Sequence, residues 1–469
     1  MKRSNIISIY RALDKKEARE LGKWLDSPVH NTRTDVQDLH RYLLAGDHLD
    51  NDRFLKKERV FRKIFPKEPF DDARLRQTVH FLNRCVEEFL AYRQWKEKEV
   101  DSRLSLAAAL RRKKLDSPLQ RTLNQVAKMQ DDGPFRTEAF FRNEFLRRQE
   151  IYTHLVAADQ RTHQTELQSV ADALDQAYLI EKMKLSCEML FHQAIFKTEY
   201  RTELLTPVMD YVERRELYHI PALAIYYYVL KAIIEQRDDN FYFESLRVTV
   251  TRHGDLLPTA DLRNVYLMAI NLTIPKINAG LEDFLREAFE WYRLGLENKI
   301  LIENDRITRY TFLNVVRNAI HLDELDWVEG FLRDYPRYLS NDYRENTYQF
   351  ARAQLLFARR DFDTVMPLLN TIDFKDDVHN IIGKTMLLQI FYDLDEFDAF
   401  DSGLDSMRTF VSRKQLNRIH ELNFQHVIKY LRRLGRLSPT DRAGRRSLYE
   451  EIETVAPLSI KDWLLERTR

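Results

Sequence analysis

A 35-residue repeat in residues 306–411 constrains the fold more than any other feature of the sequence. An acidic residue followed by an aromatic one recurs at this interval, each time after a segment that is expected to be helical. The three pairs are Asp326-Trp327, Asp361-Phe362 and Glu396-Phe397. We expect each pair to mark the loop of a helix-loop-helix unit, which predicts three such units in phase.

The segment before each loop carries a regular set of mostly apolar residues. Its positions are i, i+3 and i+7, namely Leu313, Val316 and Ile320, then Tyr348, Ala351 and Leu355, then Gly383, Met386 and Ile390. This spacing places the residues of each set on one face of a helix. Because a helical hairpin buries such a face by stacking on its neighbours, the pattern predicts an α-solenoid.

A second column of residues runs beside the apolar one and is polar at eight of its nine positions. Its members are Tyr310, Asn314, Arg317, Glu345, Gln349, Arg352, Asn380, Lys384 and Leu387. The amides and the lysine can hydrogen-bond an extended backbone, and the arginines can bind a carboxylate. We therefore predict that a partner contacts Asn314, Arg317, Gln349, Arg352 and Lys384. The alternative is that the column is only the solvent-facing side of each helix.

The composition is that of a folded soluble protein without a recognisable catalytic motif. Hydrophobic residues make up 44% and charged residues 31%, while glycine accounts for only 11 of 469 residues. So little glycine argues against a nucleotide-binding enzyme with phosphate-cradling loops. His420-Glu421 resembles the start of a helical zinc motif, but the second ligand is absent because Phe424 stands at that position. We expect no enzymatic activity, no cofactor and no metal.

The sequence predicts a cytoplasmic protein. Cys85 and Cys187 stand about a hundred residues apart, a pattern that favours buried thiols in a reducing compartment over a disulfide framework. The apolar run at residues 6–10 ends at Arg11 and is too short for an export signal. No stretch approaches the roughly 18 uncharged apolar residues of a membrane span, so none is expected.

Helical patterns run along the whole chain and predict an all-α protein. A plausible capping pair, Asp14 and Glu17, opens a helix that ends at Ser27-Pro28. The N-terminal helices are expected to form a bundle, followed by an α-solenoid of tetratricopeptide-like hairpins. The predicted division is a basic bundle at 1–130, an arch of long helices with degenerate hairpins at 135–300, regular repeats at 301–435, and capping helices at 436–469.

Charge is distributed unevenly and leaves a second function open. Residues 1–150 carry 33 Lys and Arg against 24 Asp and Glu, whereas the remainder carries 41 against 49. Basic clusters occur at Lys56-Lys57, Arg62-Lys63 and residues 111–114, with aromatics interleaved at Phe54, Phe61 and Phe65. This basic third is compatible with nucleic-acid binding, although at helical spacing the aromatics fit a core as well as a stacking surface. We favour a protein or peptide partner.

Residues 346–377 resemble a tetratricopeptide repeat. Aligned on Asp361-Phe362, they place Ala353 at the small position of the family and Leu356, Val365 and Leu369 at apolar positions, while the neighbouring units carry Asn318 and Leu388 at the small position. The resemblance covers about 105 residues well. It implies a helical-repeat fold and a noncatalytic scaffold or adaptor that binds other proteins.

The chain more broadly resembles a group of uncharacterised bacterial helical-repeat proteins. The residues that carry this resemblance are Ser27-Pro28 with Asn31, Val60-Phe61 with Phe65-Pro66, Arg74-Leu75-Arg76 before Glu87-Glu88-Phe89-Leu90, and Asn278-Ala279-Gly280. This resemblance implies a helical-repeat fold, and it implies no activity.

Overall fold

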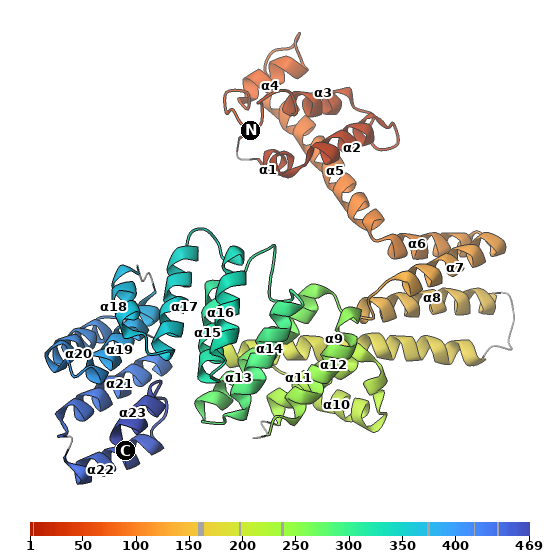
Figure 1. Ribbon diagram of the computed structural model, residues 1–469. Helices are drawn as coiled ribbons and strands as arrows, with labels where there is room; N and C mark the ends of the chain where they lie inside the picture. Colours follow the sequence, from red (N-terminus) through yellow and green to blue (C-terminus); the bar gives the residue numbers. More distant parts are fainter. Residues whose placement is uncertain are drawn as a thin grey trace. The chain divides into compact units, whose positions relative to one another are not determined.

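The computed structural model describes residues 1–469 apart from 3, 158–163, 197, 236–238, 373–375, 417 and 439. The protein is all-α, as predicted, and its described part contains α-helices α1 to α23, three short 3₁₀ helices and one isolated bridge between Glu303 and Arg306 (Figure 1). No helix in this part is long and apolar enough to cross a membrane. The chain divides into two compact units.

The N-terminal unit comprises Met1–Gly133 and Arg142–Leu174. Its helices are α1 (Asn5–Ala12), α2 (Lys15–Asp26), α3 (Thr34–Leu43), α4 (Lys57–Ile64), α5 (Asp72–Glu97), α6 (Glu99–Arg112), α7 (Asp116–Asp132) and most of α8 (Glu138–Ala157). Buried apolar residues from α1 to α5 form one core. Helices α6 and α7 pack as a hairpin with a smaller core of Ala107, Leu119 and Leu123.

The start of α2 confirms the predicted capping pair. The carboxylate of Asp14 accepts hydrogen bonds from the backbone N–H groups of Lys16 and Glu17, at 2.6 and 2.7 Å. The Glu17 side chain in turn accepts from the Asp14 N–H at 2.8 Å. These bonds satisfy donors that the first helical turn leaves unpaired. The helix ends at Asp26, directly before Ser27.

The C-terminal unit comprises Pro134–Phe141 and Asp175–Arg469. Its helices are most of α9 (Gln164–Phe196), α10 (Leu205–Arg214), α11 (Pro221–Ile234), α12 (Phe241–His253), α13 (Thr259–Asn278), α14 (Asp283–Glu297), α15 (Arg309–His321), α16 (Leu325–Asp334), α17 (Arg344–Ala358), α18 (Phe362–Thr371), α19 (Asp377–Asp393), α20 (Phe397–Ser412), α21 (Arg418–Arg436), α22 (Arg442–Thr454) and α23 (Lys461–Thr468). Helices α11 to α23 pack mainly against neighbours in chain order. A stack of hairpins requires such packing; the solenoid itself stays a prediction.

The predicted apolar face of the three repeats is buried. Val316, Ala351 and Ile390 are fully enclosed, and most of the other positions in the set are also buried, whereas Ile320 and Tyr348 are half-buried. Residues from α15, α17 and α19 belong to one continuous core that begins near Leu179 in α9. The i, i+3, i+7 pattern therefore identified the side of each helix that packs inward.

The loop of the first repeat lies two residues earlier than the 35-residue interval predicts. A residue in the left-handed conformation stands two positions before each second helix, at Asp323, Arg360 and Asp395. Phe362 and Phe397 are the first residues of α18 and α20, but Asp326-Trp327 lies inside α16, which begins at Leu325. The expectation that Asp326-Trp327 marks a loop is wrong. The left-handed residue that follows α15, Asp323, comes two positions before the one that the 35-residue interval predicts.

Helix α23 packs against the end of the repeat region. Leu464 is fully buried in a core shared with α19 to α22. Arg467 forms a bidentate pair with Asp393, the last residue of α19, with nitrogen–oxygen distances of 2.7 and 2.8 Å. Arg360, which follows α17, lies 3.4 Å from Glu466. Contacts from α23 thus reach the C-terminal ends of α17 and α19, the first helices of the second and third repeats.

Candidate partner-binding surface

The five residues predicted to contact a partner lie on the first helices of the three repeats. Asn314 and Arg317 belong to α15, Gln349 and Arg352 to α17, and Lys384 to α19. Both arginines are exposed, whereas the other three side chains are half-buried. Helices α15 and α17 pack side by side. The structure therefore places the column on a surface that is open to solvent at Arg317 and Arg352.

Asn314 takes part in a local hydrogen-bond network. Its side-chain oxygen accepts a hydrogen bond from Nη2 of Arg317 at 2.8 Å. The neighbouring helix α14 carries Tyr292, a buried residue whose pKa burial raises to about 12. Asn314 thus orients Arg317, in addition to any contact with a partner.

Gln349 and Lys384 are also partly engaged within the protein. Gln349 donates from Nε2 to Glu345 at 2.6 Å, while its Oε1 is enclosed and has no hydrogen-bond partner among the described residues. The Lys384 ammonium lies 5.7 Å from the centroid of the Phe410 ring on α20. Arg352 makes no hydrogen bond or ion pair with the described part of the chain, so its five N–H donors face solvent.

The Arg317 guanidinium is exposed but lies close to surrounding protein. The Arg317 side chain is exposed, yet burial lowers its pKa. Both observations agree if protein surrounds the guanidinium on most sides without covering it. No described carboxylate forms an ion pair with Arg317, so the charge is compensated only by the Asn314 carbonyl and by solvent.

Sequence reasoning missed other basic groups on these first helices. The His379 ring on α19 lies against Phe350 of α17 in a tilted arrangement, with ring centroids 5.5 Å apart, and its centroid lies 6.3 Å from that of Tyr310 on α15. Arg309 lies 3.9 Å from Asp376, the residue that caps α19. A signal was present, because Arg309, Arg344 and His379 are spaced by the repeat length of 35 residues.

The basic N-terminal clusters surround a packed core. Lys56, Lys57, Arg62 and Lys63 are exposed, and Lys57 pairs with Asp72 at 2.7 Å. The interleaved aromatics do not form a stacking surface, because Phe61 and Phe65 are buried and Phe54 is half-buried beneath the Arg59 guanidinium. Two of the three rings are therefore core residues.

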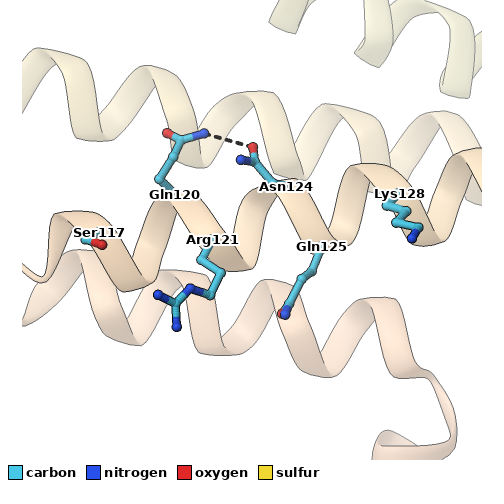
Figure 2. A pocket seen from close by; sticks show the side chains of 6 residues that line it. All are labelled: Ser117, Gln120, Arg121, Asn124, Gln125 and Lys128. Carbon is cyan, nitrogen blue, oxygen red and sulfur yellow. Dashed lines mark hydrogen bonds between the residues drawn. The ribbon is translucent and has the colours of Figure 1, made fainter.

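The exposed side of α7 provides a second basic surface. Arg112 ends α6, Lys113 and Lys114 form the turn before α7, and all three are exposed. Figure 2 shows the polar side chains that line a shallow, open depression along α7: Ser117, Gln120, Arg121, Asn124, Gln125 and Lys128. Gln120 donates to Asn124 at 3.0 Å. This lining contains two cations and no carboxylate, but it is the outward side of one helix and not an enclosed site.

The remaining reactive groups do not assemble into a recognised site. Both cysteines are buried as free thiols, and burial raises the pKa of each. Among the described residues, no three His, Cys, Asp or Glu side chains converge closely enough to hold a metal ion.

Comparisons of the chain with protein-family models, curated protein sequences and solved structures found no match. The resemblances to tetratricopeptide repeats and to bacterial helical-repeat proteins stay predictions, and function is argued from the surface itself.

Proposed function

We propose that the protein is a noncatalytic scaffold or adaptor that binds another protein or peptide in the cytoplasm. The binding surface is formed by Asn314, Arg317, Gln349, Arg352 and Lys384. The observation that supports it most directly is the pair of exposed arginines, Arg317 and Arg352, at equivalent positions of two packed helices without a described carboxylate partner. Arginine is enriched in protein interfaces because its planar fork binds carboxylates in bidentate geometry.

The packing of α15 on α17 indicates what partner would fit. Neighbouring helices lie about 8–10 Å apart, and a segment in the polyproline II conformation rises about 3.1 Å per residue and presents every third side chain on the same side. Arg317 and Arg352 are thus separated by roughly three residues of such a segment. A partner with acidic side chains three positions apart would place one carboxylate on each arginine. The buried apolar face beneath them holds both helices rigidly, which limits the entropy lost on binding.

The proposal is tested with a triple variant in which Asn314, Gln349 and Arg352 become Ala. The tagged full-length chain and the variant would each be used to capture proteins from the native cell extract, with quantification by mass spectrometry. We expect the variant to lose the parent's specific partners while its helical circular dichroism and thermal unfolding change little, because none of these side chains is fully buried.

A matched variant controls for loss of surface polarity. Arg333, Asn370 and Arg408 are exposed on α16, α18 and α20, the second helices of the same repeats. Replacing these three with Ala should leave partner capture unchanged. Retention of every partner by the first triple variant, or equal losses in both variants, would reject the proposed surface.

A further inference from the structure

One row of polar residues runs along the outward side of α7. Its members have the spacing i, i+4, i+7 and i+11, which places them on one face of the helix, and they are Ser117, Arg121, Asn124 and Lys128. The row is about 16 Å long. The opposite face is buried at Leu119, Leu123 and Val126. Because this buried face fixes the rotation of α7, the polar row is held toward solvent.

The chain does not neutralise the cations on this surface. Residues 112–130 contain five cations, all exposed, and one carboxylate, which gives a net charge of +4. None of the five cations forms an ion pair with a described residue, whereas Arg111, one position earlier, lies 2.6 Å from Glu150. The one carboxylate is that of Asp116. Acidic residues resume at 131–132, so the basic surface ends there.

The uncharged side chains between the cations can both donate and accept hydrogen bonds. Gln120 donates from Nε2 to Oδ1 of Asn124 at 3.0 Å, which leaves the Gln120 oxygen as an acceptor and the Asn124 amide nitrogen as a donor. Figure 2 shows this pair on one side of α7, and Arg121 with Gln125 on the other. A phosphate oxygen only accepts, whereas the 2′-hydroxyl of a ribose donates and accepts. The cations therefore suit phosphates, and the amides suit ribose hydroxyls.

We propose that this face of α7, together with the cations of residues 112–114, binds double-stranded RNA through its phosphates and 2′-hydroxyls. An A-form duplex presents these groups across a wide, shallow minor groove, which a flat polar surface can contact. The row contains no aromatic ring, so the unpaired bases of a single strand would find nothing to stack on. A DNA duplex lacks the hydroxyls. The surface belongs to the N-terminal unit, and the proposal goes beyond the protein partner of the repeats and does not depend on it.

The salt dependence of binding follows from the number of phosphates contacted. In a duplex, each neutralised phosphate contributes about −0.9 to the slope of log affinity against log salt. Contacts from Arg121, Lys128 and two of the cations at 112–114 give a slope of about −3.6. The dissociation constant for the RNA duplex should therefore increase about a hundredfold between about 50 and 200 mM salt.

The test is fluorescence anisotropy of a labelled RNA duplex of about 20 base pairs, titrated with the full chain. A DNA duplex of the same sequence and a single RNA strand are titrated in parallel. We expect the RNA duplex to bind at least about fivefold more tightly than the DNA duplex, because one hydrogen bond to a 2′-hydroxyl contributes about that factor. It should also bind more tightly than the single strand.

A double variant, Arg121→Gln with Lys128→Gln, tests the cations of the row. It should weaken binding of the RNA duplex at least about tenfold and reduce the magnitude of the salt slope by about two. The matched control on α4 is Lys56→Gln with Arg62→Gln, which removes the same charge from exposed positions in the same unit. This α4 control should leave both the affinity and the salt slope unchanged.

The amides are tested separately. Asn124→Ala with Gln125→Ala keeps every charge, so the salt slope should stay the same while the preference for RNA over DNA decreases. Both side chains are exposed, and circular dichroism would verify that each variant is folded.

Several results would overturn the proposal. They are absence of RNA-duplex binding at about 50 mM salt, equal affinity for the RNA and DNA duplexes, tighter binding of the single strand, and an equal loss of affinity in the α4 control. Displacement of the RNA by polyglutamate at equal charge concentration would also overturn it, because the surface would then recognise an acidic protein. These results leave the partner surface of the repeats untouched, since capture from cell extract tests that surface.

Discussion

Replacing Asp393 with Ala should detach α23 from the repeat region. Asp393 accepts two hydrogen bonds from Arg467 and one, at 3.3 Å, from Nε1 of Trp463. The paired side chains are only 12% and 13% exposed. Removing one partner of a buried ion pair typically costs about 3–5 kcal/mol because the remaining charge is left uncompensated. We expect the lower end, about 3 kcal/mol, since Arg467 retains a contact with Glu466.

Hydrogen exchange of peptides from α23 is the appropriate assay, because a chain with two units need not unfold in one step. A loss of about 3 kcal/mol corresponds to roughly a hundredfold faster exchange in this helix. Glu450→Ala removes a comparable pair, Glu450 with Arg446, in which the side chains are 64% and 84% exposed. It should change exchange by less than about 0.5 kcal/mol. If exchange from α23 increases less than fivefold in the Asp393 variant, the pair does not anchor this helix.

Three further predictions concern the two units. Burial lowers the pKa of His40 to about 4, so the unfolded chain takes up a proton before the folded one as pH falls below the ordinary value of about 6.5. The N-terminal unit should lose about 3 kcal/mol of stability between pH 7 and pH 4, and urea unfolding followed by hydrogen exchange should show a flatter profile for His40→Gln. Gly295→Ala should destabilise the C-terminal unit by about 1–3 kcal/mol, because its Cβ would lie 2.7 Å from Leu301; unchanged thermal unfolding would show that Leu301 adjusts freely. Any binding of single- or double-stranded DNA should be weak, sequence-independent and lost at high salt, since the basic N-terminal third offers phosphate contacts without a recognisable base-reading motif; tight, sequence-selective binding in a filter assay at high salt would contradict this.

The sequence predicted features that depend on local spacing. The Asp14 and Glu17 capping box needs only residues three apart, and it forms as expected. The buried face through Val316, Ala351 and Ile390 follows from helical periodicity, which does not depend on the path of the chain. Local strand propensity is a weaker guide, since residues 247–251 lie within α12 despite their β-branched side chains.

Other features depend on packing that no short stretch encodes. The bounds of α7 were not predicted, since its outward face is an unbroken series of polar residues and Pro118 occupies its first turn, where proline is tolerated. The first loop comes two residues earlier than predicted because the left-handed residue after α15 is Asp323. The repeat interval alone does not specify where that residue falls.

The central claim, that the repeats bind a partner through the first helices, is tested most directly by site-specific photo-crosslinking in the native extract. In one variant a photoreactive amino acid would replace Arg352 on α17. In a second variant the same photoreactive amino acid would replace Arg333 on α16. Both positions are exposed. We predict that position 352 yields a discrete crosslinked protein, that a peptide with acidic residues three positions apart competes for it, and that position 333 yields none. Crosslinks of equal yield and identity at both positions, or none at 352, would contradict the proposed surface.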